Sequence, residues 1–343
     1  MKKLLLSLLV VIVAASVQAK SWKIGPSSVT GMDFASINAA MSSSYVASGD
    51  TLYLDQYYNE SAAQTVTKKV VIIGTGYDTN LTDEQVVATL TNTLNLKANY
   101  VEVKSVKLST VFFYNDDCIL DRCYANGIST QSSTAGMNHI YSCYIFGYIH
   151  GYSSSSSSQF DIQNCCIYYY LSSNSDYYII EYLDNSIINN NTIIGNGSYI
   201  YCLYDYITNT QITNNIILNT VSGRDFGSNS IYSSGSGNTI EHNIFGNNSA
   251  LTYYPTNKLG FGSKSSELFT QTGNYSDFYK LADKSAAKGY ATDGGDVGCH
   301  GGMFGCPSGG RPQYIPYFTK VTVGSRSEDG KLPVSISVKI QEE

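Results

Sequence analysis

INNNTI (188–193) and ITNNII (212–217) are two copies of the six-residue frame that decides the fold of this chain. Four further copies are LDRCYA (120–125), IYSCYI (140–145), IQNCCI (162–167) and IEHNIF (240–245). Each copy opens with an aliphatic residue, and its fourth residue is cysteine in the first three copies and asparagine in the last three. Successive copies start 20 to 28 residues apart. This spacing predicts one short unit that is stacked repeatedly, with loops of variable length between the units.

The stacking predicts columns of like residues, because residues that share a frame position lie one strand spacing apart, about 4.8 Å. The first position gives an inward-facing aliphatic column: Leu120, Ile140, Ile162, Ile188, Ile212 and Ile240. The fourth position gives a column of free, buried thiols followed by corner asparagines: Cys123, Cys143, Cys165, Asn191, Asn215 and Asn243. Asparagine at a corner can adopt the left-handed backbone conformation and bond the amides of neighbouring units. A straight thiol column lacks tetrahedral convergence, so no metal site is expected.

The N-terminus has the pattern of a secretory signal peptide. Two lysines precede an apolar run from Leu4 to Val13, and small residues end at Ala19. Residues 1–19 are therefore predicted to be removed, and the protein is expected to be secreted: extracellular, periplasmic or at the cell surface. The apolar run is too short for a comfortable membrane span, and nothing later in the chain resembles one, so no membrane span is expected.

Composition narrows the class of protein. From Lys20 onward the chain has 19 basic and 27 acidic side chains, a net charge of −8, which disfavours nucleic acid as a partner. It contains 30 tyrosines, and asparagine and serine crowd the turns between β-branched or aromatic runs, which is typical of an all-β protein. Eight cysteines in an exported protein permit disulfides, and Cys299 with Cys306 is the strongest candidate pair.

The segments that flank the frames predict the two ends of the stack. GMDFASINAAM (31–41) predicts a helix with Asp33 as its N-cap, placed where it covers an otherwise open sheet end. After Pro312, two alternating runs surround an Asp-Gly turn signal and predict a hairpin. The expected domains are a stack over residues 20–311 and a C-terminal hairpin or extension over residues 312–343.

Several of these segments together resemble a known superfamily. DFASINAAM (33–41) leading to GDTLYL (49–54), VVIIGTGY (70–77), the asparagine-bearing frames and YKLADKSAAKGYATDGGDVGCHGG (279–302) are similar to secreted bacterial right-handed parallel β-helix proteins of the pectate-lyase-like superfamily. The resemblance spans residues 21–302 and implies an all-β, single-stranded right-handed parallel β-helix, a solenoid, with an N-terminal helical cap. It implies no single activity, because the same fold carries lyases, hydrolases, epimerases and non-catalytic adhesins.

The chain departs from the family members that act on acidic glycans. Residues 108–257 hold ten acidic residues and only two basic ones, Arg122 and Arg224. This excess of negative charge repels uronate chains unless cations intervene, so a polyuronate lyase is disfavoured. The Gly-His-Gly and Arg-x-Lys elements of polygalacturonase-type hydrolases also have no match, and no catalytic residue of the family is carried over. A neutral or weakly charged polysaccharide is the expected partner.

The best local candidate for chemistry comes from laying residues 177–188 over residues 201–212 without a gap. Glu181 then lies over Asp205, within roughly 5–6 Å, near the carboxylate separation of retaining glycosidases. Such a pair raises the pKa of one carboxyl group and supplies an acid together with a base or nucleophile. The alternative is a solvated pair of acids at a corner, because perturbed acids mark functional sites only statistically.

Tyrosines beside this pair are expected to stack on sugar rings, and these carbohydrate-binding candidates are Tyr182, Tyr204 and Tyr206. The acidic residues Asp116, Asp117 and Asp121 leave calcium open as a ligand, although an exposed acidic turn is the more common explanation. No other cofactor is expected. The histidines His139, His150 and His242 occupy different repeat positions and predict no metal cluster.

The sequence leads to two hypotheses from different classes. The first is a secreted protein, expected to be a monomer, that binds or cleaves a polysaccharide along its elongated face, with a glycoside hydrolase favoured over a polyuronate lyase. Glu181 and Asp205 are its predicted catalytic residues. The second is a non-catalytic surface or adhesive β-helix that serves as a rigid spacer or binding module. Whether the protein is an enzyme stays open at this stage.

Overall fold

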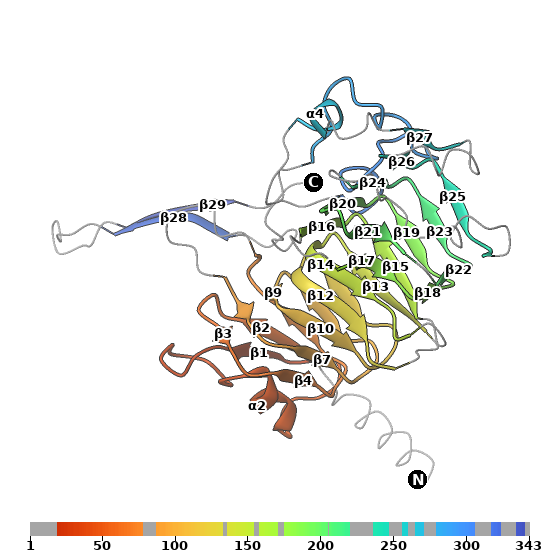
Figure 1. The fold of residues 1–343 in the computed structure, drawn as a ribbon. Helices are drawn as coiled ribbons and strands as arrows, with labels where there is room; N and C mark the ends of the chain where they lie inside the picture. Colours follow the sequence, from red (N-terminus) through yellow and green to blue (C-terminus); the bar gives the residue numbers. More distant parts are fainter. Residues whose placement is uncertain are drawn as a thin grey trace, which may run out of the picture.

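The computed structural model describes residues 19–77, 87–132, 136–153, 158–170, 175–204, 206–219, 236–246, 256–259, 265–270 and 279–305, together with the backbone of 317–323 and 334–339. Within these residues the protein is all-β, with long sheets of parallel strands and two short helices, α2 (Ile37–Ser42) and α4 (Ser265–Leu268) (Figure 1). Neither helix is long and apolar enough to cross a membrane. Residues 1–18 of the predicted signal peptide lie outside the described residues.

A ten-stranded parallel sheet runs the length of the molecule, and each of its strands pairs with the strand one repeat away. In spatial order its strands are β1 (Ser21–Ile24), β2 (Thr51–Leu54), β5 (Val71–Ile73), β8 (Glu102–Lys104), β11 (Ile119–Asp121), β13 (Met137–Tyr141), β15 (Gln159–Gln163), β19 (Ile187–Asn189), β23 (Gln211–Thr213) and β25 (Thr239–Glu241). The order of the strands in the sheet is their order in the chain. Because the strands are parallel, each connection must bring the chain back to the end of the sheet where the strands begin.

A fifteen-stranded parallel sheet lies beside it. Its main path is β4 (Gln64–Val66), β7 (Leu94–Leu96), β10 (Thr110–Phe113), β12 (Tyr124–Thr130), β14 (Tyr144–His150), β16 (Cys166–Tyr170), β20 (Thr192–Asn196), β24 (Ile216–Asn219), β26 (Ile244–Phe245) and β27 (Lys258–Leu259). Strands off this path are β3 (Asn59–Glu60), β6 (Thr89–Leu90), β9 (Lys107–Leu108), β17 (Tyr177–Glu181) and β21 (Ile200–Leu203). A separate parallel pair joins β18 (Leu183–Asp184) to β22 (Ile207–Thr208).

Each frame crosses from the ten-stranded to the fifteen-stranded sheet. Its first residue lies in one sheet, its last two begin a strand of the other, and the pattern repeats from β11 and β12 to β25 and β26. The predicted aliphatic column is confirmed, because its six members are consecutive ladder partners and each is fully buried: Leu120, Ile140, Ile162, Ile188, Ile212 and Ile240. The stacking register expected from the sequence is therefore the register of the structure at this position.

The left-handed corner lies at the third frame position, not at the fourth as the sequence analysis expected. All six residues there have φ between 52° and 58°: Arg122, Ser142, Asn164, Asn190, Asn214 and His242. The backbone turns at this residue, so the fourth residue can point its side chain into the interior along the stacking direction. The sequence predicted that one asparagine both adopts the left-handed conformation and bonds the amides of neighbouring units. In the structure the third residue does the first and the fourth residue does the second.

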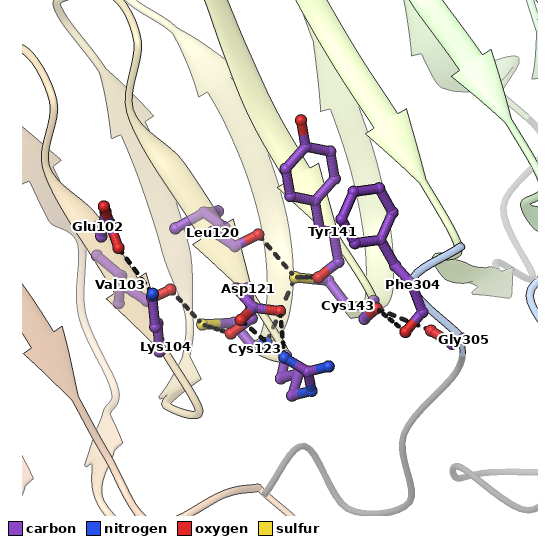
Figure 2. Close-up of polar contacts among 12 residues, drawn as sticks. Glu102, Val103, Lys104, Leu120, Asp121, Cys123, Tyr141, Cys143, Phe304 and Gly305 are labelled. Atoms are coloured by element: carbon purple, nitrogen blue, oxygen red, sulfur yellow. Dashed lines mark hydrogen bonds and ion pairs between the residues drawn. The ribbon is translucent and has the colours of Figure 1, made fainter. Parts of the chain in front are cut away.

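The fourth position forms a continuous hydrogen-bonded ladder. The Oδ1 atom of Asn215 accepts the main-chain N–H of Asn191 at 2.8 Å, and Asn215 Nδ2 donates to the carbonyl of Ile188 at 2.7 Å. Cysteines make a weaker version of the same contacts, since Cys143 Sγ accepts the N–H of Cys123 at 3.3 Å (Figure 2). Burial raises the pKa of both thiols, so they stay protonated and can donate to main-chain carbonyls.

The ladder also extends beyond the last frame. Asn257, which precedes β27, accepts the N–H of Asn243 at 2.9 Å and donates to the carbonyl of Ile240. The sequence analysis missed this seventh member because the residues around Asn257 do not match the frame. The thiols of Cys123, Cys143 and Cys165 are free and buried as predicted, but they are ladder members as well as small apolar residues.

The third-position residues hold the C-terminal segment, residues 285–305. Asn214 Oδ1 accepts the N–H of Thr292, Asn190 Nδ2 donates to the carbonyl of Asp296, and Asn164 Nδ2 donates to that of Cys299. At the ends of this column, His242 Nδ1 contacts the carbonyl of Tyr290, and Ser142 donates to those of Phe304 and Gly305 (Figure 2). The segment therefore runs back along the corner of five frames.

The N-terminal helix is shorter than predicted. Helix α2 begins at Ile37, and Ser36 is its N-cap, with Ser36 Oγ accepting the N–H of Ala39. Asp33, the predicted N-cap, instead accepts the N–H of Lys23 in β1. At the other end of the chain, β28 (Tyr317–Val323) pairs antiparallel with β29 (Val334–Lys339), and the pair lies apart from the parallel sheets in Figure 1.

Asn215→Ala is expected to lower the free energy of unfolding by about 2–4 kcal/mol, because it leaves the N–H of Asn191 and the carbonyl of Ile188 buried without their partners. Asn215→Cys should cost about 1 kcal/mol less, since a thiol already serves at this position in three frames. Urea unfolding monitored by circular dichroism measures both. The exposed Asn126→Ala is the control, and equal stability of Asn215→Ala and wild type would contradict a structural ladder.

Candidate functional site

The candidate site lies where the fifteen-stranded sheet divides. The first residues of β14 pair with β16, whereas Ile149 and His150 at its other end pair with Ile180 and Glu181 of β17. Strand β21 then pairs with β17, so β17 and β21 form a branch beside the main path (Figure 1). Ile149, Ile180 and Leu203 are fully buried ladder partners on the inner face of this branch.

The ends of β14 and β17 are tied together by main-chain contacts. Gly151 donates its N–H to the carbonyl of Glu181 at 3.0 Å. A side chain at position 151 has no space, because a Cβ atom there would overlap the carbonyl oxygen of Tyr182. Tyr182 itself has φ 60°, so the chain turns directly after Glu181. Glycine at 151 and the turn at 182 together hold His150 and Glu181 side by side.

The imidazole of His150 and the carboxyl group of Glu181 form a half-buried pair. His150 Nδ1 lies 3.6 Å from Glu181 Oε1, and the two side chains are 22% and 8% exposed. On the other side of the ring, Nε2 lies 2.8 Å from the carbonyl oxygen of Tyr178. Because a carbonyl oxygen only accepts, Nε2 carries the ring proton, and the basic Nδ1 atom faces the carboxyl group.

The environment keeps this histidine neutral. Burial lowers the pKa of His150, and the hydrogen bond to the Tyr178 carbonyl only partly opposes this effect. A neutral imidazole with a fixed tautomer places a proton acceptor next to a carboxyl group of low exposure. The 3.6 Å between Nδ1 and Oε1 is longer than a hydrogen bond, so the two groups are close neighbours that share no proton in this structure.

Two groups of stacked tyrosines surround the pair. In the first group, the Tyr148 ring stacks on His150 with 4.3 Å between centroids, and Tyr169 stacks on Tyr177 at 4.4 Å. Tyr148 and Tyr177 meet edge to face at 6.3 Å and join these contacts. Burial raises the pKa of Tyr177, and the nearby charge of Glu181 adds to the rise.

The second group contains the tyrosines predicted from the sequence. Tyr204 stacks on Tyr178 with 3.6 Å between ring centroids, and Tyr182 stacks on Tyr206 at 5.4 Å. Tyr206 is 52% exposed, so its ring face is available to a ligand. The Glu181–His150 pair adjoins both groups, because Tyr148 stacks on His150 and the carbonyl of Tyr178 accepts from His150 Nε2.

The gapless alignment that suggested the acid pair is wrong at its start. Tyr178 pairs with Tyr201 and Ile180 with Leu203, one residue out of that alignment, whereas Leu183 pairs with Ile207 as the alignment requires. The second unit therefore contains one additional residue between these points. Asp205 falls in this stretch and lies outside the described residues, so the Glu181–Asp205 pair stays a prediction. The alternative of a solvated corner does not hold for Glu181, which is 6% exposed.

Sequence reasoning missed the pairing of His150 with Glu181. The two residues are 31 apart, longer than the spacing between frames, because β16 and residues 171–176 precede β17. The available signal was the match of YIHGY (148–152) with IIEYL (179–183), in which an apolar residue precedes and a turn residue follows the polar one. That match was not recognised because the frame alone was used for alignment.

A second polar cluster lies on the ten-stranded sheet. Tyr141 donates to Asp161 Oδ2 at 2.5 Å, Gln163 Nε2 donates to Asp161 Oδ1 at 2.7 Å, and His139 Nδ1 lies 2.7 Å from the Tyr141 oxygen. The Phe304 ring covers Tyr141 in a parallel stack at 4.4 Å. Burial opposes ionisation of Asp161, but the hydrogen bonds from His139, Tyr141 and Gln163 outweigh it and lower its pKa. The cluster stabilises a buried carboxylate under the C-terminal segment.

Arg122, the basic residue of the first frame, is paired with a neighbouring carboxylate. Arg122 Nη1 donates to both carboxylate oxygens of Asp121 at 3.0 and 2.9 Å, and Asp121 is visible beside the cysteine ladder in Figure 2. In the part of the chain that the structure describes, no three His, Cys, Asp or Glu side chains are grouped so that they could hold a metal ion.

Neither a protein-family model nor a curated protein sequence matches this chain.

The pH dependence of stability tests the Asp161 cluster. The pKa of Asp161 is lower in the folded protein than its ordinary value of 3.8, so its contribution is complete above the unfolded-state pKa and is lost as the pH falls through the folded-state pKa. Tyr141→Phe should therefore cost about 1.5–3 kcal/mol at pH 7 and progressively less below pH ~4.

Urea unfolding of wild type and Tyr141→Phe at several pH values measures this difference. Tyr53→Phe, an exposed tyrosine on β2 of the same sheet, is the matched control. A Tyr141→Phe effect of the same size at pH 7 and in strong acid would show that the hydroxyl does not act through the carboxylate.

Proposed function

We propose that this protein is a secreted right-handed parallel β-helix of the pectate-lyase-like superfamily that binds a neutral or weakly charged polysaccharide. In this proposal the parallel sheets wind as one solenoid, and α2 closes its N-terminal end. The in-register ladders from β1 to β27 support the winding, and the contact of α2 with β4 through Asn38 and Gln64 supports the cap. The resemblance described above supports the superfamily.

The observation that carries the binding site is the half-buried Glu181–His150 pair between two groups of stacked tyrosines. Sugar rings present apolar C–H faces and a rim of hydroxyl groups, and stacked aromatic rings beside polar groups complement both. The scarcity of basic residues between 108 and 257 favours an uncharged chain over a polyuronate.

A hydrolytic function is the second candidate, and the proximity of the His150 imidazole to the carboxyl group of Glu181 favours it. In this reaction Glu181 donates its proton to the glycosidic oxygen as the bond to the anomeric carbon breaks. His150 Nδ1, 3.6 Å from Glu181 Oε1, is a base beside this acid. Asp205 remains the predicted second carboxylate that acts as base or nucleophile. Without turnover, the same surface serves a non-catalytic adhesive or spacer protein.

Binding should depend on the exposed tyrosine. Tyr206→Ala is expected to weaken the binding of a polysaccharide roughly tenfold, the loss of about 1.4 kcal/mol of stacking. An array of neutral and acidic polysaccharides, with and without calcium, identifies the ligand, and titration calorimetry gives the Kd. Tyr45→Ala, which removes a tyrosine 72% exposed near α2, is the control. Unchanged affinity of Tyr206→Ala would place the binding surface elsewhere.

Turnover should depend on Glu181. Glu181→Gln keeps the size of the side chain but removes its proton exchange, so it is expected to abolish release of reducing ends while binding and melting temperature change little. Reducing-end assays on the polysaccharide found by the array measure turnover. Normal turnover by Glu181→Gln would remove Glu181 from the mechanism, and binding without turnover by wild type would leave the non-catalytic function.

A further inference from the structure

Two cysteines that are far apart in the sequence meet outside the main core. Cys165 and Cys166 are neighbours in the third frame, but Cys165 belongs to the ladder inside, whereas Cys166 belongs to a second buried cluster on the outer face of the fifteen-stranded sheet. Cys299, from the C-terminal segment, belongs to this second cluster too. Cys166 is 2% exposed and Cys299 is fully buried.

Independent contacts fix the backbone of Cys299 beside that of Cys166. Thr192 is the ladder partner of Cys166 on β20, and its Oγ1 atom accepts the N–H of Cys299 at 3.1 Å. Asn164, two residues before Cys166, donates to the Cys299 carbonyl at 3.1 Å. Gly298 has φ 95° and packs against Thr192, so a side chain there would be strained and crowded. Both thiols are free and buried in the structure.

We propose that Cys166 and Cys299 are joined by a disulfide in the exported protein, and that this bond fastens the C-terminal segment to the outer face of the fifteen-stranded sheet. Each thiol loses its hydrogen as the S–S bond forms, and the two electrons and two protons reduce a disulfide-containing oxidant to two thiols. The proposal depends on the predicted export to an oxidising compartment and is independent of the glycan-binding site.

The ladder cysteines are less suited to cross-linking. The Cys143 thiol accepts the N–H of Cys123 and lies within hydrogen-bonding distance of main-chain carbonyls, so oxidation would remove an S–H donor from a buried column. Their cross-links would also close only short loops, because neighbours in the column are 20 and 22 residues apart. A bond from 166 to 299 closes a far longer loop, which restricts the unfolded chain more strongly.

Peptide mapping tests the connectivity. The full chain is refolded in oxidised glutathione, alkylated under denaturing conditions without reductant, and digested with chymotrypsin. The sequence then yields Cys166 in peptide 161–168, Cys299 in peptide 291–304 and Cys306 in peptide 305–314. The expected product links the first two peptides, with fragment ions that assign the bond to Cys166 and not to Cys165. A Cys299–Cys306 link, a link through Cys165 or complete alkylation of Cys299 would overturn the proposal.

Thermal unfolding with and without dithiothreitol gives a second readout. Reduction is expected to lower the melting temperature of wild type by about 5–10 °C. The same shift should occur in Cys306→Ser and be absent from Cys166→Ser and Cys299→Ser. A shift that disappears in Cys306→Ser, or persists in Cys166→Ser, contradicts the assigned pair. If a serine variant does not fold, the peptide map of wild type decides the question alone.

Discussion

Satisfaction of main-chain amides between stacked units is the constraint on which this structure depends. Every unit turns from one sheet to the next at a buried corner, where the strand ladders are interrupted and N–H and carbonyl groups would be left without partners. The fourth frame position supplies them, as Asn215 does for Asn191 and Ile188. The third position makes this arrangement accessible, because its left-handed backbone directs the next side chain inward. The third frame residue therefore turns the chain, and the fourth frame residue bonds the stacked units to each other.

The candidate site arises where this regular scheme is locally broken. Strand β14 is long enough to pair with both β16 and β17, and its second half places His150 beside Glu181. Regular alternation alone would have set an acidic side chain among Ile179 and Leu183, at a high cost for an unpaired charge. The branch and the turn at Tyr182 instead give Glu181 an imidazole partner and an aromatic border.

The periodic part of the fold was readable from the sequence, and the irregular part was not. A column such as Ile140–Ile162–Ile188 is a direct result of spacing, so its register followed from the frames. The N-cap of α2 could not be located that way, because Ser36 and Asp33 are both good caps and tertiary contacts with β1 assign Asp33 to another task. Likewise, the additional residue before Ile207 has no signature of its own, and it displaced the alignment on which the acid pair rested.

The corner residues recognise the C-terminal segment mainly through its main chain. Asn190 contacts the carbonyl of Asp296, Asn164 that of Cys299, and Ser142 that of Gly305. Such recognition resembles the way a sheet edge accepts a strand of any composition. Side chains of this segment that face away from the sheets can therefore change without altering its path. Gly301 and Gly302 cannot change freely, because a Cβ atom there would approach the Asn190 side chain to 2.9 and 2.8 Å.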